Sequence, residues 1–98
     1  MDLRFYVDPQ TGEPHIYGHG VSEEEVGEVL ADPGEARQGR EDSWVAIGAT
    51  AVGRILRVIY SPDPVPGSVF VITAYDLTGK PLAAYRRRQR RKRRRSSR

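Results

Sequence analysis

Two arginines and three tyrosines occupy or follow the most apolar stretch of the chain. They are Arg54, Arg57, Tyr60, Tyr75 and Tyr85. A guanidinium grips a phosphate with a planar fork of N–H donors, and a tyrosine ring can stack on a nucleobase. These residue types therefore predict a face that binds phosphate or nucleic acid. The alternative is structural, because an arginine stem can cover apolar surface and a tyrosine can lie half-buried in a core.

The two histidines, His15 and His19, are four residues apart. This spacing would suit a metal ion on a helix, but Gly18 and Gly20 argue against a helix there and no third ligand stands out. The chain has no cysteine, which excludes a disulfide and a zinc-thiolate site. We expect neither a metal nor a cofactor. We assign His19 either a structural role beside a helix start or a role in proton transfer, for which imidazole is suited near neutral pH.

The C-terminal segment 86–98 is strongly basic. It holds ten of the 16 Lys and Arg residues and no acid, whereas residues 1–85 carry six basic and 13 acidic residues, a net charge of −7. Cations without interleaved aromatic residues attract phosphates but read no sequence. The candidate nucleic-acid-binding residues are Arg86, Arg87, Arg88, Arg90, Arg91 and Lys92. A localisation signal, a tether to an acidic surface, or a solubility tail are the other interpretations. Because like charges repel, we expect a disordered or helical tail.

The apolar runs 54–60 and 68–75 predict a pair of antiparallel strands. Both runs are rich in β-branched and aromatic residues, and three prolines and a glycine in 61–67 force the chain to turn between them. Both faces of each run are apolar, which predicts a position in the middle of a sheet. With an even register sum, Arg57 and Tyr75 share one face and Arg54 takes the other.

A helix is predicted at 22–31, where Ser22 and Glu25 have capping-box spacing and Asp32-Pro33 ends the pattern. The acids at 23–25 fit the positive end of this helix dipole better than a metal cluster. Further strands are predicted at 3–7 and 44–50, and a short helix after Thr78. Residues 35–42 are polar and without periodicity.

Together these elements predict a single α+β domain over residues 1–85, with a mostly antiparallel sheet, one N-terminal helix and one C-terminal helix. No apolar run approaches the ~18 residues of a membrane span, and the N-terminus does not read as a signal peptide. We therefore expect a cytoplasmic protein with no membrane partner.

Several short motifs follow one another in a familiar order. They are Phe5–Pro9, His19–Val21 before the capped acidic helix, Ile47-Gly48, Gly53–Tyr60, and Val71–Ala74 with Tyr85 behind them. This succession, which covers residues 3–85, resembles the BrnT-type toxins of the RelE/ParE-like toxin superfamily. The resemblance implies a RelE-like fold, a bacterial cytosol, and a metal-independent ribonuclease that is restrained by a DNA-binding antitoxin. Such enzymes activate a ribose 2′-OH for attack on the adjacent phosphate. By position, His19, Arg54 and Tyr85 match the pattern of the family.

Two departures from that pattern stand out. Tyr75 occupies a position where these toxins usually carry a basic residue, and residues 1–85 are acidic where those toxins are usually basic. The basic tail then takes over the attraction of RNA.

We expect a toxin-like endoribonuclease of a type II toxin–antitoxin system that acts on mRNA. The candidate catalytic residues are Arg54, Arg57, His19, Tyr75 and Tyr85. The arginines would hold the scissile phosphate, and the others would transfer protons or stack a base. The partners would be RNA, an antitoxin and, through an exposed strand edge, a second copy of the chain. The alternative is a binding module without catalysis, whose basic tail holds nucleic acid.

Overall fold

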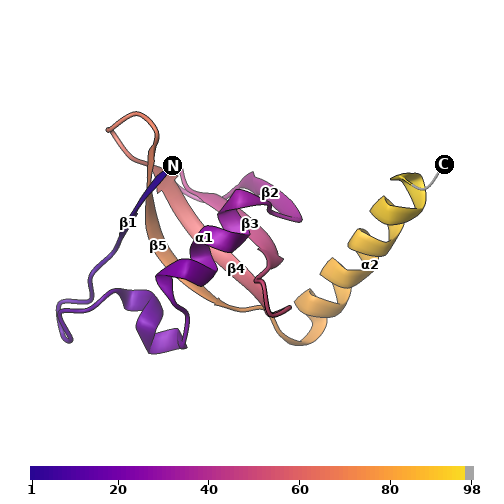
Figure 1. The fold of residues 1–98 in the computed structure, drawn as a ribbon, viewed down its shortest axis with the longest axis horizontal. Coiled ribbons are helices and arrows are strands. Elements are labelled where there is room, and N and C mark those ends of the chain that lie inside the picture. The colour runs from indigo at the N-terminus through magenta and orange to yellow at the C-terminus, as the bar shows by residue number, and fades with distance from the viewer. Residues whose placement is uncertain (97–98) are drawn as a thin grey trace.

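The chain forms a five-stranded mixed sheet with two α-helices, an α+β architecture, in a computed structural model that describes residues 1–96, with side chains through Arg94 (Figure 1). The strand order is β1-β5-β4-β3-β2. The elements are β1 (Asp2–Phe5), the 3-10 helix η1 (His15–His19), α1 (Glu23–Ala31), β2 (Glu35–Gln38), β3 (Trp44–Ala49), β4 (Ile55–Pro62), β5 (Ser68–Asp76) and α2 (Gly79–Ser96).

The predicted central hairpin is confirmed. β4 and β5 pair antiparallel and both lie inside the sheet. Arg57 stands directly opposite Tyr75, so these two side chains share a face as predicted. A bulge between Ile59 and Tyr60 shifts the register toward the loop. β1 joins β5 in parallel, which makes the sheet mixed, although its other three pairings are antiparallel.

The first helical element of the chain is the short η1, and the predicted helix follows as α1. Ser22 caps α1 through a complete capping box: its hydroxyl accepts from Glu25 N, and Ser22 N donates to the Glu25 carboxylate at 3.0 Å. α1 lies across one face of the sheet and buries Val26 and Val29 against it (Figure 1). We call this the α1 face, and its strand residues include Ala46, Leu56, Val58, Val71 and Ala74.

The opposite side of the sheet, the α2 face, carries a second and smaller apolar cluster. Val45 and Ile47 of β3 are buried there with Leu77, and Leu82 and Tyr85 from the first turns of α2 pack on them. Arg57 and Tyr75 lie on this same face, because Ile47, Arg57 and Tyr75 are register partners across β3, β4 and β5. The α2 face is thus apolar near α2 and polar farther along the same row.

The sequence patterns did not reveal β2. Three of its four side chains are exposed, so the strand has no apolar alternation to detect. It forms through its antiparallel pairing with β3 at the edge of the sheet. Glu41 and Asp42 both have positive φ in the turn that follows, as the two central residues of a type I′ hairpin turn do. The polar segment 35–42 therefore forms one strand of a β-hairpin and part of its turn.

α2 is much longer than the short helix that Leu82 and Tyr85 predicted. It runs for 18 residues, from Gly79 to Ser96, and extends away from the sheet beyond its first turns (Figure 1). The predicted boundary between residues 85 and 86 falls inside this helix. Residues 86–96 of the basic segment are therefore helical, and residues 97–98 lie outside the described part of the chain.

Tyr85 anchors α2 to the start of β2. Its ring is 5% exposed and packs over Gly34. A Cβ atom at Gly34 would lie 2.0 Å from the Tyr85 hydroxyl, so only glycine leaves room for this contact. Gln89 Nε2 then donates to the Gly34 carbonyl at 3.1 Å, and Arg88 forms an ion pair with Glu35. One glycine thus fixes where the basic helix leaves the domain.

Candidate functional site

Four rings form a continuous row beside β5. Ring centroids are 6.0 Å apart for Tyr6 and His15, 5.1 Å for His15 and His19, and 5.9 Å for His19 and Tyr75. η1 supplies both imidazoles, and it lies against β5, which supplies Tyr75. His19 is exposed, so a ligand can reach it from solvent. The chain therefore brings two proton-transfer groups and an aromatic ring together on its surface.

His15 has a carboxylate partner. Its Nδ1 atom lies 3.6 Å from Asp8 Oδ2, and the two residues flank a turn that Asp8 itself organises. The Asp8 carboxylate accepts a hydrogen bond from Gln10 N at 2.9 Å, as the first residue of an Asx-turn does. The Asp8 carboxylate therefore lies where it can hold the His15 ring in one orientation, with Nδ1 directed toward Asp8.

Arg57 extends the row onto β4, directly opposite Tyr75. Its Nε atom is buried and makes no hydrogen bond within the described residues, and neither does Thr73 Oγ1 on the neighbouring strand. No ion pair involves Arg57 there. A guanidinium without a protein partner on a partly covered face can bind an anion. Of the predicted residues, His19 and Tyr75 are therefore brought together, and Arg57 lies on the neighbouring strand.

Arg54, also predicted as catalytic, is fully engaged by the protein. Its Nε and Nη2 atoms donate to the two carboxylate oxygens of Asp76, each at 2.9 Å, and Nη1 donates to Glu25 at 2.9 Å and to the Gly20 carbonyl at 3.0 Å. The Asp76 and Glu25 carboxylates raise the pKa of Arg54 further above its already high value. Its side chain links the N-terminus of α1 to β5 and is only 29% exposed.

Tyr85 is separated from the other candidates. It lies by the β2 edge, whereas His19 and Tyr75 lie beyond β4. Burial, followed by the nearby Glu35 carboxylate, raises the pKa of Tyr85, which makes this phenol a poorer proton donor and base near neutral pH. The structure therefore gives Tyr85 a packing role rather than a place in the row of rings.

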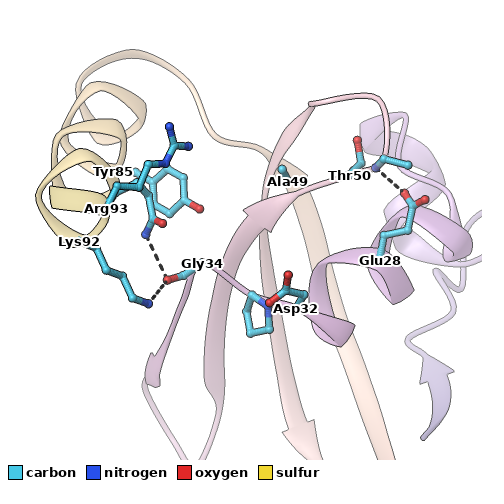
Figure 2. Close-up of a pocket in the computed structure, with 11 residues that line it drawn as sticks. Glu28, Asp32, Gly34, Ala49, Thr50, Tyr85, Lys92 and Arg93 are labelled. Carbon is cyan, nitrogen blue, oxygen red and sulfur yellow. Dashed lines mark hydrogen bonds between the residues drawn. The ribbon is translucent and has the colours of Figure 1, made fainter. Parts of the chain in front are cut away.

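Tyr85 does line a cleft of about 860 Å³, which opens between α2 and the C-terminal end of α1 (Figure 2). Glu28 and Asp32 lie on the α1 side of this cleft, and Lys92 and Arg93 lie on the α2 side. Glu28 already accepts a hydrogen bond from Ala51 N at 3.1 Å. The cleft contains no imidazole, so proton transfer is better placed at the row of rings.

The basic residues of α2 divide between two sides of the helix. Arg88, Gln89 and Lys92 face the start of β2, where Arg88 bonds Glu35 and Lys92 Nζ lies 3.5 Å from the Gly34 carbonyl. The other side carries four arginines that together line a shallow surface hollow: Arg87, Arg90, Arg91 and Arg94. Arg86, the remaining candidate, is exposed. The predicted nucleic-acid-binding residues therefore form one docking side and one cationic stripe.

No family model matches the chain, and no curated protein matches it. Within residues 1–96, no group of three or more His, Asp or Glu side chains could hold a metal ion. The same part of the chain contains no helix with the length and apolar character needed to cross a bilayer. The function must therefore be inferred from the side chains of the site.

Sequence reasoning missed three residues of interest. It considered His15 only as a metal ligand, although its spacing from His19 was visible. In the structure the two rings are neighbours on η1, with centroids 5.1 Å apart. No sequence pattern pointed to Arg37 and Arg40 as site residues, because the strand that positions them, β2, was itself not predicted. They line a hollow with Arg57.

Proposed function

We propose that this protein is a metal-independent endoribonuclease whose active site is the row formed by His15, His19, Tyr75 and Arg57. One observation supports this most strongly: two imidazoles 5.1 Å apart lie in line with a tyrosine whose cross-strand neighbour is an unpaired arginine. Cleavage of RNA without a metal needs a base, an acid and a cation at the phosphate. The two imidazoles would supply the base and the acid, and Arg57, on the strand next to Tyr75, would supply the cation.

The reaction is a transesterification within the RNA strand. His19 removes the proton of a ribose 2′-OH, and the 2′-oxygen forms a bond to the adjacent phosphorus. The bond from phosphorus to the 5′-oxygen breaks, and protonated His15, oriented by Asp8, donates a proton to that oxygen. The products are a 2′,3′-cyclic phosphate and a free 5′-OH. Arg57 stabilises the charge on the non-bridging oxygens, and Tyr75 stacks a neighbouring base.

On the strength of the motif resemblance, the proposal assigns this activity to a bacterial toxin–antitoxin system. In this proposal the substrate is mRNA, the protein acts in the cytosol, and an antitoxin restrains it. The open outer edge of β1 offers a strand that an antitoxin or a second copy of the chain could extend. The stripe on α2 holds the RNA electrostatically while the row of rings acts on it.

The deciding experiment offers the purified protein an unstructured RNA in the presence of excess EDTA. We expect cleavage, with products that end in a 2′,3′-cyclic phosphate. A DNA of the same sequence, which lacks the 2′-OH, and an RNA with 2′-O-methyl groups serve as matched controls and should stay intact. RNA that survives enzyme in excess, or equal cleavage of the DNA, would contradict the proposal.

A second candidate, nucleic-acid binding without catalysis, is favoured by the stripe on α2. Arg87, Arg90 and Arg91 are exposed on one side of a helix that extends away from the domain. Each phosphate that such cations neutralise releases a bound counterion. This arrangement suits binding to any sequence and requires no part of the row of rings.

The triple variant Arg87→Ala/Arg90→Ala/Arg91→Ala tests the stripe. Because three phosphate contacts would be lost, the slope of log affinity for single-stranded RNA against log salt should fall by about 2. Fluorescence anisotropy across a salt series measures this slope. Lys80→Ala, at the opposite end of α2, is the control for a lost cation and should leave the slope nearly unchanged. An unchanged slope in the triple variant would place RNA binding elsewhere.

A further inference from the structure

Three arginines line one hollow on the α2 face. Arg37 of β2, Arg40 of the β2–β3 turn and Arg57 of β4 surround a space of about 390 Å³, and no acidic residue lines it. Ser43 and the apolar side chains of Val45 and Ile59 form the rest of the wall. We call this hollow the arginine pocket. Arg57 links the pocket to the row of rings, because it lies opposite Tyr75 on the neighbouring strand.

The lack of acidic partners is unusual for this part of the chain. Residues 1–85 contain 13 acids and only six basic residues. Arg4 pairs with Asp63 at 3.0 Å, and Arg54 bonds two carboxylates. Among the residues described, the side chains of Arg37, Arg40 and Arg57 form no ion pair and no hydrogen bond, and the Nε atom of Arg57 is buried.

The nearest acid in the strand is directed elsewhere. Glu35 lies two residues before Arg37, on the same face of β2, yet its carboxylate accepts two hydrogen bonds from Arg88 of α2. An acid that could have neutralised the arginine pocket is thus used to dock the basic helix. Three like charges that share one hollow repel each other, and an anion between them would remove that repulsion.

The backbone holds the pocket in shape. Arg37 faces Val45, and Val45 faces Ile59, so Arg37 and Arg57 lie in adjacent rows of the same sheet face. Arg40 begins the tight turn, which Ser43 N closes by donating to the Arg40 carbonyl at 2.9 Å. The strands and the turn therefore fix the backbone positions of all three arginines before any ligand arrives, so that only their side chains must be ordered on binding.

We infer that the arginine pocket binds a phosphate group of RNA other than the phosphate that is cleaved. The identity of the macromolecule rests on the proposed function, whereas the preference for phosphate rests on the pocket itself. Planar guanidinium groups bind phosphate oxygens bidentately, so Arg37 and Arg40 can hold this second phosphate while Arg57, at the boundary of the pocket, contacts the scissile one. The phosphate is either an internal diester of the strand or the monoester at its 5′-end.

The experiment measures binding separately from cleavage. Anisotropy follows a short RNA whose ribose 2′-hydroxyls are O-methylated, prepared with either a 5′-OH or a 5′-phosphate. Arg37→Ala, Arg40→Ala and the double variant are compared with wild type, with Lys80→Ala as the charge-matched control for each single variant. Arg37 and Arg40 are exposed, so the variants should fold, which circular dichroism checks.

We expect each single variant to weaken binding about tenfold, as the loss of a charge-assisted phosphate contact predicts. A loss that is equal for both RNAs identifies an internal phosphate, and a loss confined to the 5′-phosphorylated RNA identifies the terminal one. Either result supports the pocket even if no cleavage is found. Arg37 and Arg40 variants that bind both RNAs as well as Lys80→Ala would overturn the inference, even if wild-type protein cleaves RNA.

Discussion

Replacement of His19 by alanine is expected to slow RNA cleavage by about 10²- to 10⁴-fold, the range that a positioned general base contributes. Replacement of Arg57 by alanine should slow it by about 10²- to 10³-fold, because the developing negative charge loses its partner. Both effects should appear in kcat more than in KM, since the stripe on α2 would still hold the RNA. Single-turnover assays with end-labelled RNA measure these rates.

Tyr17→Phe is the matched control for these variants. Tyr17 lies in η1 between His15 and His19, but its hydroxyl donates to Glu23 at 3.2 Å and its ring takes no part in the row of rings. Loss of the Tyr17 hydroxyl should leave the rate of RNA cleavage unchanged. His15→Ala should resemble His19→Ala, whereas Tyr75→Phe, which keeps the ring, should retain most activity if Tyr75 only stacks a base.

Two results would refute this site. If His19→Ala and Arg57→Ala cleave RNA at the wild-type rate, the row of rings is not catalytic. If Tyr75→Phe is as slow as His19→Ala, the hydroxyl rather than the ring matters, and proton transfer must be reassigned to Tyr75. Unchanged melting temperatures for all five variants are needed before any rate is interpreted, because η1 buries Ile16 in the main core.

The sequence predicted those helices, strands and turns that are specified by their own side chains. Ser22 and Glu25 sit at the one spacing that closes a capping box, and the prolines and glycine of 61–67 leave no choice but a turn. In the central hairpin, the two apolar faces predicted an interior position, and β4 and β5 are interior strands. Where such signals exist, sequence and structure agree.

The remaining elements depend on contacts that are distant in sequence. β2 has mostly exposed side chains and exists because β3 offers a free edge for pairing. The parallel pairing of β1 with β5 joins residues more than sixty positions apart. The length of α2 could not be predicted from its sequence, because the repulsion between its many positive charges disfavours a helix. The bond from Arg88 to Glu35 shows how one contact offsets part of that cost.

The candidate site divides in the same way. Arg57 and Tyr75 could be paired from the strand register alone, and the structure places them opposite each other. Arg54 and Arg57 looked equivalent in the sequence, since both are arginines of one apolar run. Only the fold shows that Arg54 pairs with Asp76 and Glu25, whereas Arg57 pairs with no acid in the part of the chain that the structure describes. The resemblance-based role of Arg54 therefore needs a direct test.

Replacement of Arg54 by alanine is expected to lower the free energy of unfolding by about 2–3 kcal/mol, after allowance for its partial exposure. For a domain of this size that corresponds to a melting temperature roughly 10–20 °C lower. The variant loses five hydrogen bonds and leaves Glu25 and Asp76 close together without a cation. Thermal unfolding followed by circular dichroism measures the change. Arg57→Ala should cost less, because Arg57 forms no ion pair with the described residues that would be lost.

The pH dependence gives an independent signature of the same contact. Hydrogen bonds from Arg54 lower the pKa of Asp76, and the Ser22 backbone bond followed by Arg54 lowers the pKa of Glu25. A carboxylate with a lowered folded-state pKa stabilises the fold above its unfolded pKa of about 4, and this stabilisation is lost as the pH falls further. Wild type should therefore lose stability steeply below about pH 5, and Arg54→Ala should lose less over the same range.

Arg54→Ala and Arg57→Ala should thus have opposite effects. The first should unfold at lower temperature yet cleave RNA normally when assayed well below its melting point, and the second should stay folded and cleave slowly. If Arg54→Ala instead keeps its melting temperature and loses cleavage, Arg54 touches the scissile phosphate and the network with Glu25 and Asp76 merely positions it. Melting temperature and cleavage rate, measured on both variants, thus distinguish two arginines that no sequence pattern separates. Arg54 neutralises acids within the fold, whereas Arg57 is left for an anion from outside it.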